Sequence, residues 1–307
     1  MRVIVTGGTG FIGRALCAEL VKAGHAVIVL TRDVEMAGPL LGDHVETVEW
    51  NADFGRAWMS SVDGAEAVIN LAGESIGEKR WTSARKQQII GSRLNATKAL
   101  AEAIAKAKRK PSVMINASAI GYYGPHGDEI ITENDPAGND FLAQTTKQWE
   151  DAAKKVEAHG VRLVILRNGL VLERGGVLEK FLTPFRLFAG GTLGSGKQWF
   201  SWIHRDDMIG LILLALENKN VKGAINATAP EPVTMKDFCK TLGKVMGRPS
   251  WTPVPSFVLK LALGEMSTLV LDGQRVIPAV AEKAGYKFKY RKAEDALAAI
   301  LRKNSDR

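Results

Sequence analysis

The sequence contains few cysteines: only Cys17 and Cys239, far apart along the chain. Their separation matches no zinc site or dithiol redox motif, so we expect two buried thiols of a reducing compartment and no disulfide framework. Histidine, cysteine and acidic residues are not grouped at metal-ligand spacings either, which predicts no metal site. A chain of 307 residues can bury a full core without such cross-links.

Long apolar runs are also missing. The amino-terminal apolar stretch in MRVIVTGGTG ends at glycines, and no run of about 18 apolar residues follows, so we expect a cytoplasmic protein with no membrane partner. The net charge of +8 raises the question of nucleic acid. However, the densest basic run, AKAKRK at 105–110, closes a helical pattern just before Pro111, where cations suit the helix dipole. We therefore predict no nucleic-acid partner, because binding of an anionic dinucleotide is the less demanding explanation of a basic protein.

What the sequence does contain, over its first 170 residues, is an alternation of short β-branched runs with longer helical patterns. We expect strands at 2–6, 26–31, 44–50, 65–73, 112–119 and 161–169, and helices at 11–24, 82–108 and 139–158. Strands that are apolar almost throughout are buried on both faces, and strand–helix alternation is typical of a parallel sheet. The sequence thus predicts an α/β fold of the Rossmann type, with a doubly wound parallel sheet.

The pattern changes after residue 170. Glycine and aromatic residues become frequent at 191–202, and then we expect a helix at 205–217, one more strand at 224–229, and helices at 253–264 and 293–303. We assign 1–170 to the Rossmann domain, with pieces of about 200–229 returning to its sheet. Residues 171–199 and 230–307 are predicted to form a smaller, substrate-side lobe.

The strongest motif is VTGGTGFIG at 5–13, where Gly7, Gly10 and Gly13 directly follow an expected strand and open an expected helix. The first glycine permits a tight turn, the second lets the backbone approach a pyrophosphate, and the third allows close helix–strand packing. The unpaired N–H groups of the helix amino terminus favour the anion. We predict a dinucleotide site here, to which Thr9, Phe11 and Ile12 also belong.

The end of the second strand distinguishes NAD from NADP. NAD sites usually place an acid there to accept hydrogen bonds from the ribose 2′-hydroxyl. This chain has Thr31 at that position, followed by Arg32, and its carboxylate arrives two positions late, at Asp33. Arginine can pair bidentately with a 2′-phosphate. The sequence favours NADP (NADPH) over NAD, although Arg32 as a solvated loop residue remains an alternative.

Several segments resemble the extended short-chain dehydrogenase/reductase superfamily: NLAG at 70–73, NASAIGYYG at 116–124 and WIHRDD at 202–207. GTGFIG, INLAGE, GSR, SAIGYYG, WE, GSGKQWFSWIH and VIP are more closely similar to an atypical branch of it. Its members are usually labelled epimerase-family, or nucleoside-diphosphate-sugar-epimerase-like, with a carboxyl-terminal conserved helical region. The resemblance extends over essentially the whole chain.

In that superfamily, a tyrosine exchanges a proton with the substrate while hydride moves at the nicotinamide, and a lysine four residues later lowers the tyrosine pKa. The matching stretch here is FLAQTTKQWE at 141–150. Anchored on Glu150, the two positions are Leu142 and Thr146; shifted by one to use Lys147, the tyrosine position is an alanine. Neither register supplies a tyrosine, so the superfamily's central acid is missing.

The resemblance implies roles for further residues. Ser118 would keep the serine role. Tyr123 lies in a segment that more often packs or contacts substrate than transfers protons; Tyr123, Arg93 and ordered water are the candidates to replace the lost acid, and Lys147 is a further candidate catalytic residue. Arg93 stands at the asparagine position and would reach the coenzyme or a substrate carboxylate, unless it is a surface arginine. The remaining coenzyme contacts implied are backbone contacts of Leu71, Ala72 and Gly73, and Arg167 directed toward the nicotinamide.

The substrate side gives weaker signals. GTLGSGK at 191–197 resembles the start of a P-loop, but Gln198 follows instead of serine or threonine, so we reject ATP binding. Nucleotide-sugar relatives have an arginine four residues before the histidine that is His204 here, and this chain has Phe200. We expect His204 to cap a turn. The aromatic residues Trp199, Phe200 and Trp202 are either pocket walls or core.

These observations lead to three hypotheses. The first is an atypical NADP-dependent oxidoreductase that acts on an unidentified small carbonyl or hydroxyl compound, with a homodimer as an open option. The second is a non-catalytic NADP-binding regulator, which the missing tyrosine favours. The third, a sugar-nucleotide epimerase, conflicts with both the missing tyrosine and Phe200.

Overall fold

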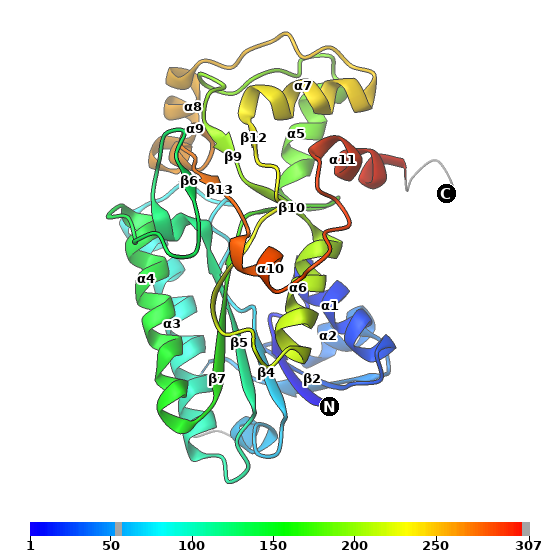
Figure 1. Ribbon diagram of the computed structural model, residues 1–307, viewed down its shortest axis with the longest axis vertical. Coiled ribbons are helices and arrows are strands. Elements are labelled where there is room, and N and C mark those ends of the chain that lie inside the picture. The colour runs from blue at the N-terminus through cyan, green and yellow to red at the C-terminus, as the bar shows by residue number, and fades with distance from the viewer. Residues whose placement is uncertain (53–56, 303–307) are drawn as a thin grey trace.

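A seven-stranded parallel sheet forms the centre of the computed structural model, which describes residues 1–52 and 57–302 (Figure 1). Its strand order is β11-β7-β5-β4-β1-β2-β3. All seven strands predicted from the sequence are present, and the Rossmann-type fold is confirmed. Their bounds are β1 (Arg2–Thr6), β2 (Ala26–Thr31), β3 (Val45–Glu49), β4 (Ala67–Asn70), β5 (Val113–Ala119), β7 (Arg162–Asn168) and β11 (Gly223–Ala227).

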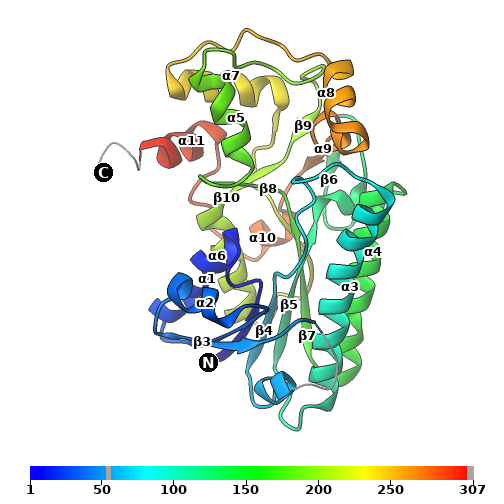
Figure 2. The same cartoon turned by 180° about the vertical axis from the view of Figure 1, so that it is seen from behind.

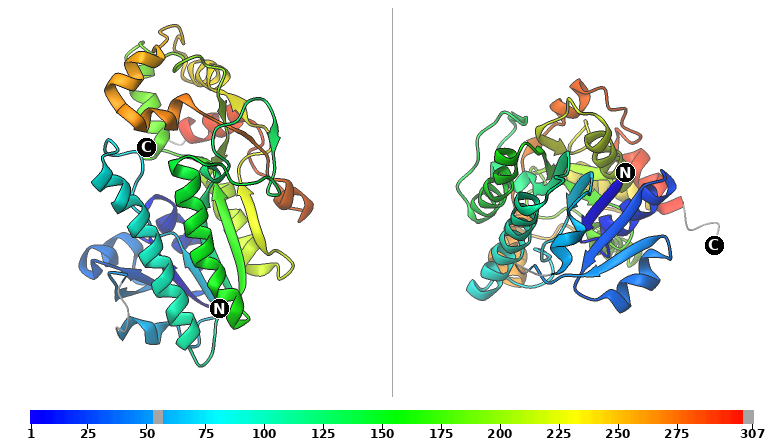
Figure 3. Two further views of the ribbon diagram at one scale, coloured as in Figure 1. Left: turned by 90° about the vertical axis from the view of Figure 1, so that its left-hand side faces the viewer. Right: turned by 90° about the horizontal axis from the view of Figure 1, so that it is seen from below.

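Helices cover both faces of this sheet, which explains the apolar strands. In β1, Val3 and Val5 pack toward α1 (Phe11–Lys22) and α6 (Arg205–Glu217). Ile4, between them, packs on the opposite face against α3 (Ser83–Lys106). There α3 and α4 (Phe141–Lys154) lie side by side (Figure 3). Alternate side chains of one strand therefore belong to two separate cores.

Side-chain caps determine where three of the helices begin. Thr82 accepts a hydrogen bond from the backbone N–H of Arg85 and so starts α3, and Asp140 accepts from Ala143 and starts α4. Asp33 does the same for α2 (Val34–Leu41), accepting from Met36. Each cap satisfies a backbone donor that the helix itself leaves unpaired.

A smaller lobe lies beyond the carboxyl ends of the strands (Figures 1 and 2). Its core joins α5 (Val177–Arg186), α7 (Met235–Met246) and α11 (Ala293–Arg302), with Phe200 and Trp202 buried among them. These two aromatic residues are thus core, whereas Trp199 is half-buried. The other α-helices of the chain, in its described part, are α8 (Ser256–Leu263), α9 (Thr268–Leu271) and α10 (Ala279–Lys283).

Short strands form three further pairs: β8 (Leu170–Leu172) with β10 (Trp202–His204), β9 (Trp199–Phe200) with β12 (Val233–Thr234), and β6 (Ile130–Ile131) with β13 (Arg275–Val276).

Within the described ranges, no helix has the length and apolar character needed to cross a membrane. Lys303, the last residue of the helix expected at 293–303, lies outside the described residues. Both cysteines are free and buried, as expected. The direction of winding reverses between β1 and β4, and in open α/β sheets ligands bind in the crevice at such a point.

Candidate functional site

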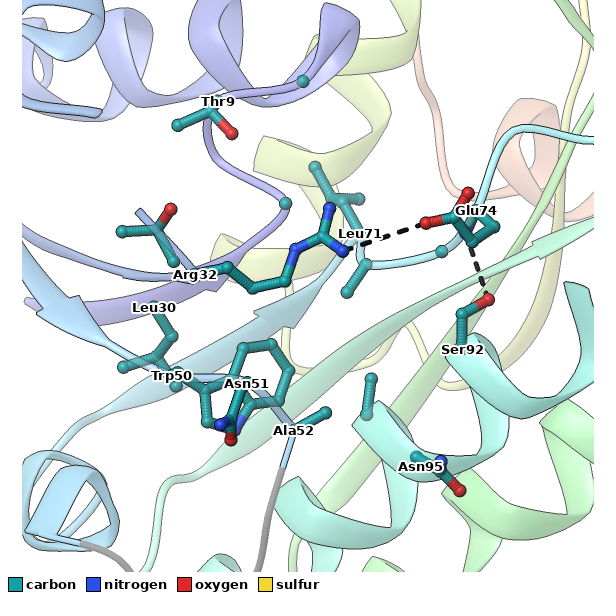
Figure 4. Close-up of a pocket in the computed structure, with 16 residues that line it drawn as sticks. Thr9, Leu30, Arg32, Trp50, Asn51, Ala52, Leu71, Glu74, Ser92 and Asn95 are labelled. Carbon is teal, nitrogen blue, oxygen red and sulfur yellow. Dashed lines mark hydrogen bonds and ion pairs between the residues drawn. The ribbon is translucent and has the colours of Figure 1, made fainter. Parts of the chain in front are cut away.

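A cavity of about 390 Å³ opens at this reversal point (Figure 4). The loops that follow β1, β2, β3 and β4 form its walls together with α3. Eight of the residues predicted to contact a coenzyme line it: Gly7, Thr9, Gly10, Thr31, Arg32, Leu71, Ala72 and Gly73. The predicted contacts Phe11, Ile12 and Gly13 lie in the first turn of α1 and are not among the lining residues.

The glycine loop has the geometry that the motif predicts. Gly7 has a φ of +68°, and a Cβ on it would lie 2.8 Å from the carbonyl oxygen of Leu71. A Cβ on Gly13 would lie 2.2 Å from the carbonyl oxygen of Gly7, so only glycine lets α1 approach the loop this closely. No side chain caps α1 at Gly10, and no acidic residue occupies its first turn. Its amino-terminal N–H groups and its dipole therefore remain available to an anion.

At the end of β2, the two charged residues have separate surroundings. The Asp33 carboxylate accepts the α2 capping hydrogen bond at 2.8 Å and does not line the cavity. The Arg32 side chain lines the cavity, is 80% exposed, and lies 3.9 Å (Nη1 to Oε1) from Glu74. Arg32 thus faces the cavity, whereas the carboxylate of Asp33 caps α2.

Arg93 lies directly behind the opposite wall. A Cβ on Gly73 would be 3.2 Å from the Arg93 guanidinium carbon, so Gly73 leaves the space that Arg93 fills. Arg93 Nη1 donates to the carbonyl oxygens of Glu74 and Ile89, both at 3.0 Å. Burial lowers the Arg93 pKa to about 10. Arg93 is not one of the lining residues, and its predicted coenzyme contact stays a prediction.

Further lining residues were not identified from the sequence. Trp50, Asn51 and Ala52 follow β3, and Ser92 and Asn95 face the cavity from α3. The carboxyl ends of parallel strands share one edge of a sheet, and that rule, applied to the expected strand at 44–50, would have identified the first three.

A buried polar network supports the cavity floor. Asn70, at the end of β4, accepts a hydrogen bond from Thr6 Oγ1 at 2.7 Å and donates to Asn116 Oδ1 at 2.7 Å and Thr97 Oγ1 at 3.0 Å. Trp149 Nε1 donates to the same threonine at 2.9 Å. The network ties β1, β4 and β5 to α3 and α4, and a fully satisfied network of this kind fixes the strand ends rigidly.

A second buried network contains Ser118 and Arg167, two residues with predicted functional roles. The Ser118 hydroxyl donates to Glu150 Oε1 at 2.7 Å, and Arg167 pairs with both oxygens of Glu150, at 2.9 and 3.0 Å. Ser118 and Glu150 are almost completely buried. Arg167 does not line the cavity, because Glu150 holds its guanidinium inside the protein. This position gives no support to the predicted nicotinamide contact of Arg167.

Tyr123 completes this second network. Its hydroxyl donates to Asn226 Oδ1 at 2.6 Å and accepts from Arg167 Nη1 at 2.9 Å. The residue is 1% exposed, and burial raises the pKa of its phenol to about 12. A proton donor must reach the reacting oxygen. Both contacts of this phenol are instead made within the protein, and Tyr122, the neighbouring phenol, stacks its ring on the Arg167 guanidinium at 3.5 Å.

The stretch that should contain the catalytic pair is the first part of α4. Thr146 and Glu150 are buried, whereas Lys147 is exposed. Leu142 packs near Gly121 and belongs to an apolar cluster with Phe141, Trp81 and Met266. Apolar side chains thus surround position 142, where the resemblance would put the catalytic tyrosine. The catalytic role of Lys147 remains a prediction, one that its exposure does not favour.

His204 has the structural role expected of it. It is fully buried, and its Nδ1 accepts from the backbone N–H of Asp206 at 3.0 Å at the start of α6. His204, Asp206 and Glu173 have potential ligand atoms within 4.8 Å of one another. However, Arg205 pairs with Glu173 and Lys289 with Asp206, each at 3.0 Å, so the two carboxylates already have cationic partners.

The parallel sheet, the glycine loop at the amino terminus of α1 and the cavity at the reversal point define an α/β protein that binds a nicotinamide dinucleotide, NAD(P). A family model, the NAD dependent epimerase/dehydratase family, matches residues 3–227, and a domain of unknown function (DUF1731) matches residues 254–300. The chain belongs to the NAD-dependent epimerase/dehydratase family.

Curated relatives match over nearly the whole chain. The epimerase family protein SDR39U1 homolog, chloroplastic, of Arabidopsis thaliana is 43% identical over 98% of this chain and 87% of its own. The epimerase family protein YfhF of Bacillus subtilis is 41% identical over 98% of both chains.

A similar solved structure is that of human epimerase family protein SDR39U1 (isoform 2) with NADPH. It is 36% identical, has a TM-score of 0.90, and is matched over 98% of this chain and 99% of that one. The UDP-glucuronic acid 4-epimerase of Bacillus cereus in complex with NAD has a TM-score of 0.78 at 19% identity, over 98% of this chain and 96% of that one, which shows a shared fold.

Proposed function

We propose that the protein is an NADP(H)-dependent oxidoreductase that acts on a small carbonyl or hydroxyl compound. The observation that carries the coenzyme choice is at the end of β2, where Arg32 faces the cavity and Asp33 is engaged in the α2 cap. A 2′-phosphate favours a guanidinium at that position, and a bare 2′-hydroxyl favours a carboxylate. NADPH, the ligand of the human relative, supports the same choice.

The chain's own residues suit such a coenzyme. The amino terminus of α1 and the glycine loop would hold the pyrophosphate, and Leu71 to Gly73 would contact the coenzyme through their backbone. When bound, the coenzyme supplies or accepts a hydride. No tyrosine is among the described residues that line the cavity, and the hydroxyls of Ser118 and Tyr123 are engaged in the second network. We therefore propose that water exchanges the proton with the substrate oxygen.

The substrate side favours a compound without a nucleotide. Phe200 occupies the position at which nucleotide-sugar relatives have an arginine, and it is buried in the core of the smaller lobe. Leu142 and its neighbours form an apolar cluster at the start of α4, where the resemblance would put the catalytic tyrosine. A substrate bound beside this cluster would have little charge, because a charged group loses water there without gaining a partner.

The test is NADPH oxidation by the purified protein against a broad panel of carbonyl compounds, with coenzyme binding measured by calorimetry on the same sample. We expect NADPH binding, and oxidation above blank with at least one compound. Binding without turnover across the panel would contradict the oxidoreductase and favour the second candidate, a non-catalytic NADP-binding regulator. The observation that favours this candidate is the burial of the Ser118 and Tyr123 hydroxyls. Absence of binding would overturn both.

A further inference from the structure

Glu74, which follows β4, is held from one side at three points. Its backbone N–H donates to Ser92 Oγ at 3.1 Å, and its carbonyl oxygen accepts from Arg93 Nη1 at 3.0 Å. Its Oε2 accepts from Arg85 Nη1 at 3.1 Å. All three partners belong to α3, and Arg85 is itself buried. Such support fixes the carboxylate at the wall of the coenzyme cavity, which Glu74 lines.

The second carboxylate oxygen of Glu74 faces Arg32. The Arg32 side chain extends from the end of β2 across the cavity, and its Nη1 lies 3.9 Å from Glu74 Oε1 (Figure 4). The two residues stand on opposite walls of the space that the dinucleotide would occupy. Among the described residues, Arg32 is the only cation that lines this cavity, and it is directed at a carboxylate of the protein itself.

A fixed carboxylate in a cavity for a polyanion repels the coenzyme, so its position there calls for an explanation. We propose that Glu74 is an internal ligand of Arg32 that competes with the 2′-phosphate of NADP(H) and so limits the selectivity for NADP(H) over NAD(H). This inference rests on the proposed binding of NADP(H). Arg32 must leave Glu74 to pair with a 2′-phosphate, whereas NAD(H) makes no such demand.

Replacing Glu74 by glutamine should therefore act selectively. The Glu74→Gln side chain keeps an oxygen for Arg85 and almost the same volume, but it loses the charge that attracts Arg32. Both partners are partly solvated, and exposed ion pairs are weak, so NADPH affinity should rise only about two- to fivefold. NADH affinity should change by less, and the ratio of the two affinities should increase.

The experiment is titration of NADPH and NADH into the wild-type protein, Glu74→Gln and a control, Glu78→Gln, at low and high salt. Glu78 is an exposed acid four residues further along the same loop and does not line the cavity, so its variant removes the same charge without touching Arg32. We expect the selective gain for Glu74→Gln alone, shrinking at high salt. In an Arg32→Ala background the same substitution should give no selective gain.

Several outcomes would overturn the inference. An equal gain for both coenzymes would make Glu74 a general source of negative potential, and a loss of affinity would make it a coenzyme ligand. If Glu74→Gln changes the affinities no more than the Glu78→Gln control does, Glu74 has no part in coenzyme recognition. If the wild-type protein binds neither coenzyme, the proposed function fails first, and that result is separate from all of these.

Discussion

The Tyr123→Phe variant separates a structural from a catalytic role for the second buried network. The substitution removes one hydroxyl and leaves the ring, so it creates almost no cavity. It deprives Asn226 Oδ1 of its donor at 2.6 Å and Arg167 Nη1 of an acceptor at 2.9 Å. Asn226 still donates to Ile277 O, and Arg167 still contacts Glu133 O, so one bond is lost on each side.

The size of the effect follows from burial. Tyr123, Asn226 and Arg167 are all almost completely buried, so water does not replace the lost hydroxyl. A buried polar group left without a partner costs about 1–3 kcal/mol. Asn226 Oδ1 loses its donor, whereas Arg167 Nη1 keeps Glu133 O as an acceptor, so we expect the free energy of unfolding to fall by roughly 1–3 kcal/mol. For a chain of this size, the melting temperature should fall by about 2–5 °C.

Denaturant and thermal unfolding of the wild type, Tyr123→Phe and Tyr122→Phe would measure this. Tyr122→Phe is the matched control, because the Tyr122 hydroxyl has no hydrogen-bond partner among the described residues and its ring stays stacked on Arg167. NADPH affinity and any turnover should be the same in all three proteins. A rate at least tenfold lower in Tyr123→Phe with unchanged stability would refute the reasoning and restore Tyr123 as the acid.

Three further predictions concern the coenzyme loop and alkaline stability. Arg32→Ala should lower the affinity for NADPH by about tenfold or more in calorimetry, because a charge-assisted pair is lost, while the affinity for NADH changes little. Gly13→Ala should lower the melting temperature and the affinity for both coenzymes, because its Cβ would lie 2.2 Å from Gly7 O. The control is Gly91→Ala, where nothing lies within 4 Å of the added Cβ and helix propensity predicts equal or higher stability. Burial raises the Tyr123 pKa from 10.0 to about 12, so its contribution to stability is fully present below pH 10 and is lost as pH rises toward 12; pH-dependent unfolding should show a smaller alkaline decline in Tyr123→Phe.

The sheet was predictable from sequence because its strands are buried on both faces. Val3 to Val5 and Val27 to Leu30 give continuous apolar runs that no exposed strand would show. Helices α2 and α5 were not predicted, because each contains a proline, Pro39 or Pro184, which interrupts a helical pattern. Helix α7 was not predicted either, although Thr234 with Asp237 three residues later is a recognisable capping signal.

The site was only partly predictable, for a different reason. Gly7 directly follows β1 and Arg32 directly follows β2, so their positions in the sequence were enough to predict that they line the cavity. Whether a polar residue such as Arg167 faces a ligand or the interior depends on a partner distant in sequence, here Glu150, and on the register of α4. Spacing along the sequence does not reveal that pairing, so Ser118 and Tyr123 were expected to act on a substrate although their hydroxyls bond within the protein.

The position of β11 at one edge of the sheet has a consequence for expression of truncated forms. β11 pairs with β7 only after the chain has passed through the smaller lobe. A fragment that stops near residue 170 would expose the backbone of β7 as an open edge, a template for aggregation. During synthesis, the nascent chain cannot complete this sheet until about three-quarters of it has left the ribosome. Genetic exchange of the smaller lobe between relatives would therefore need three junctions, near residues 170, 200 and 229, instead of a single cut.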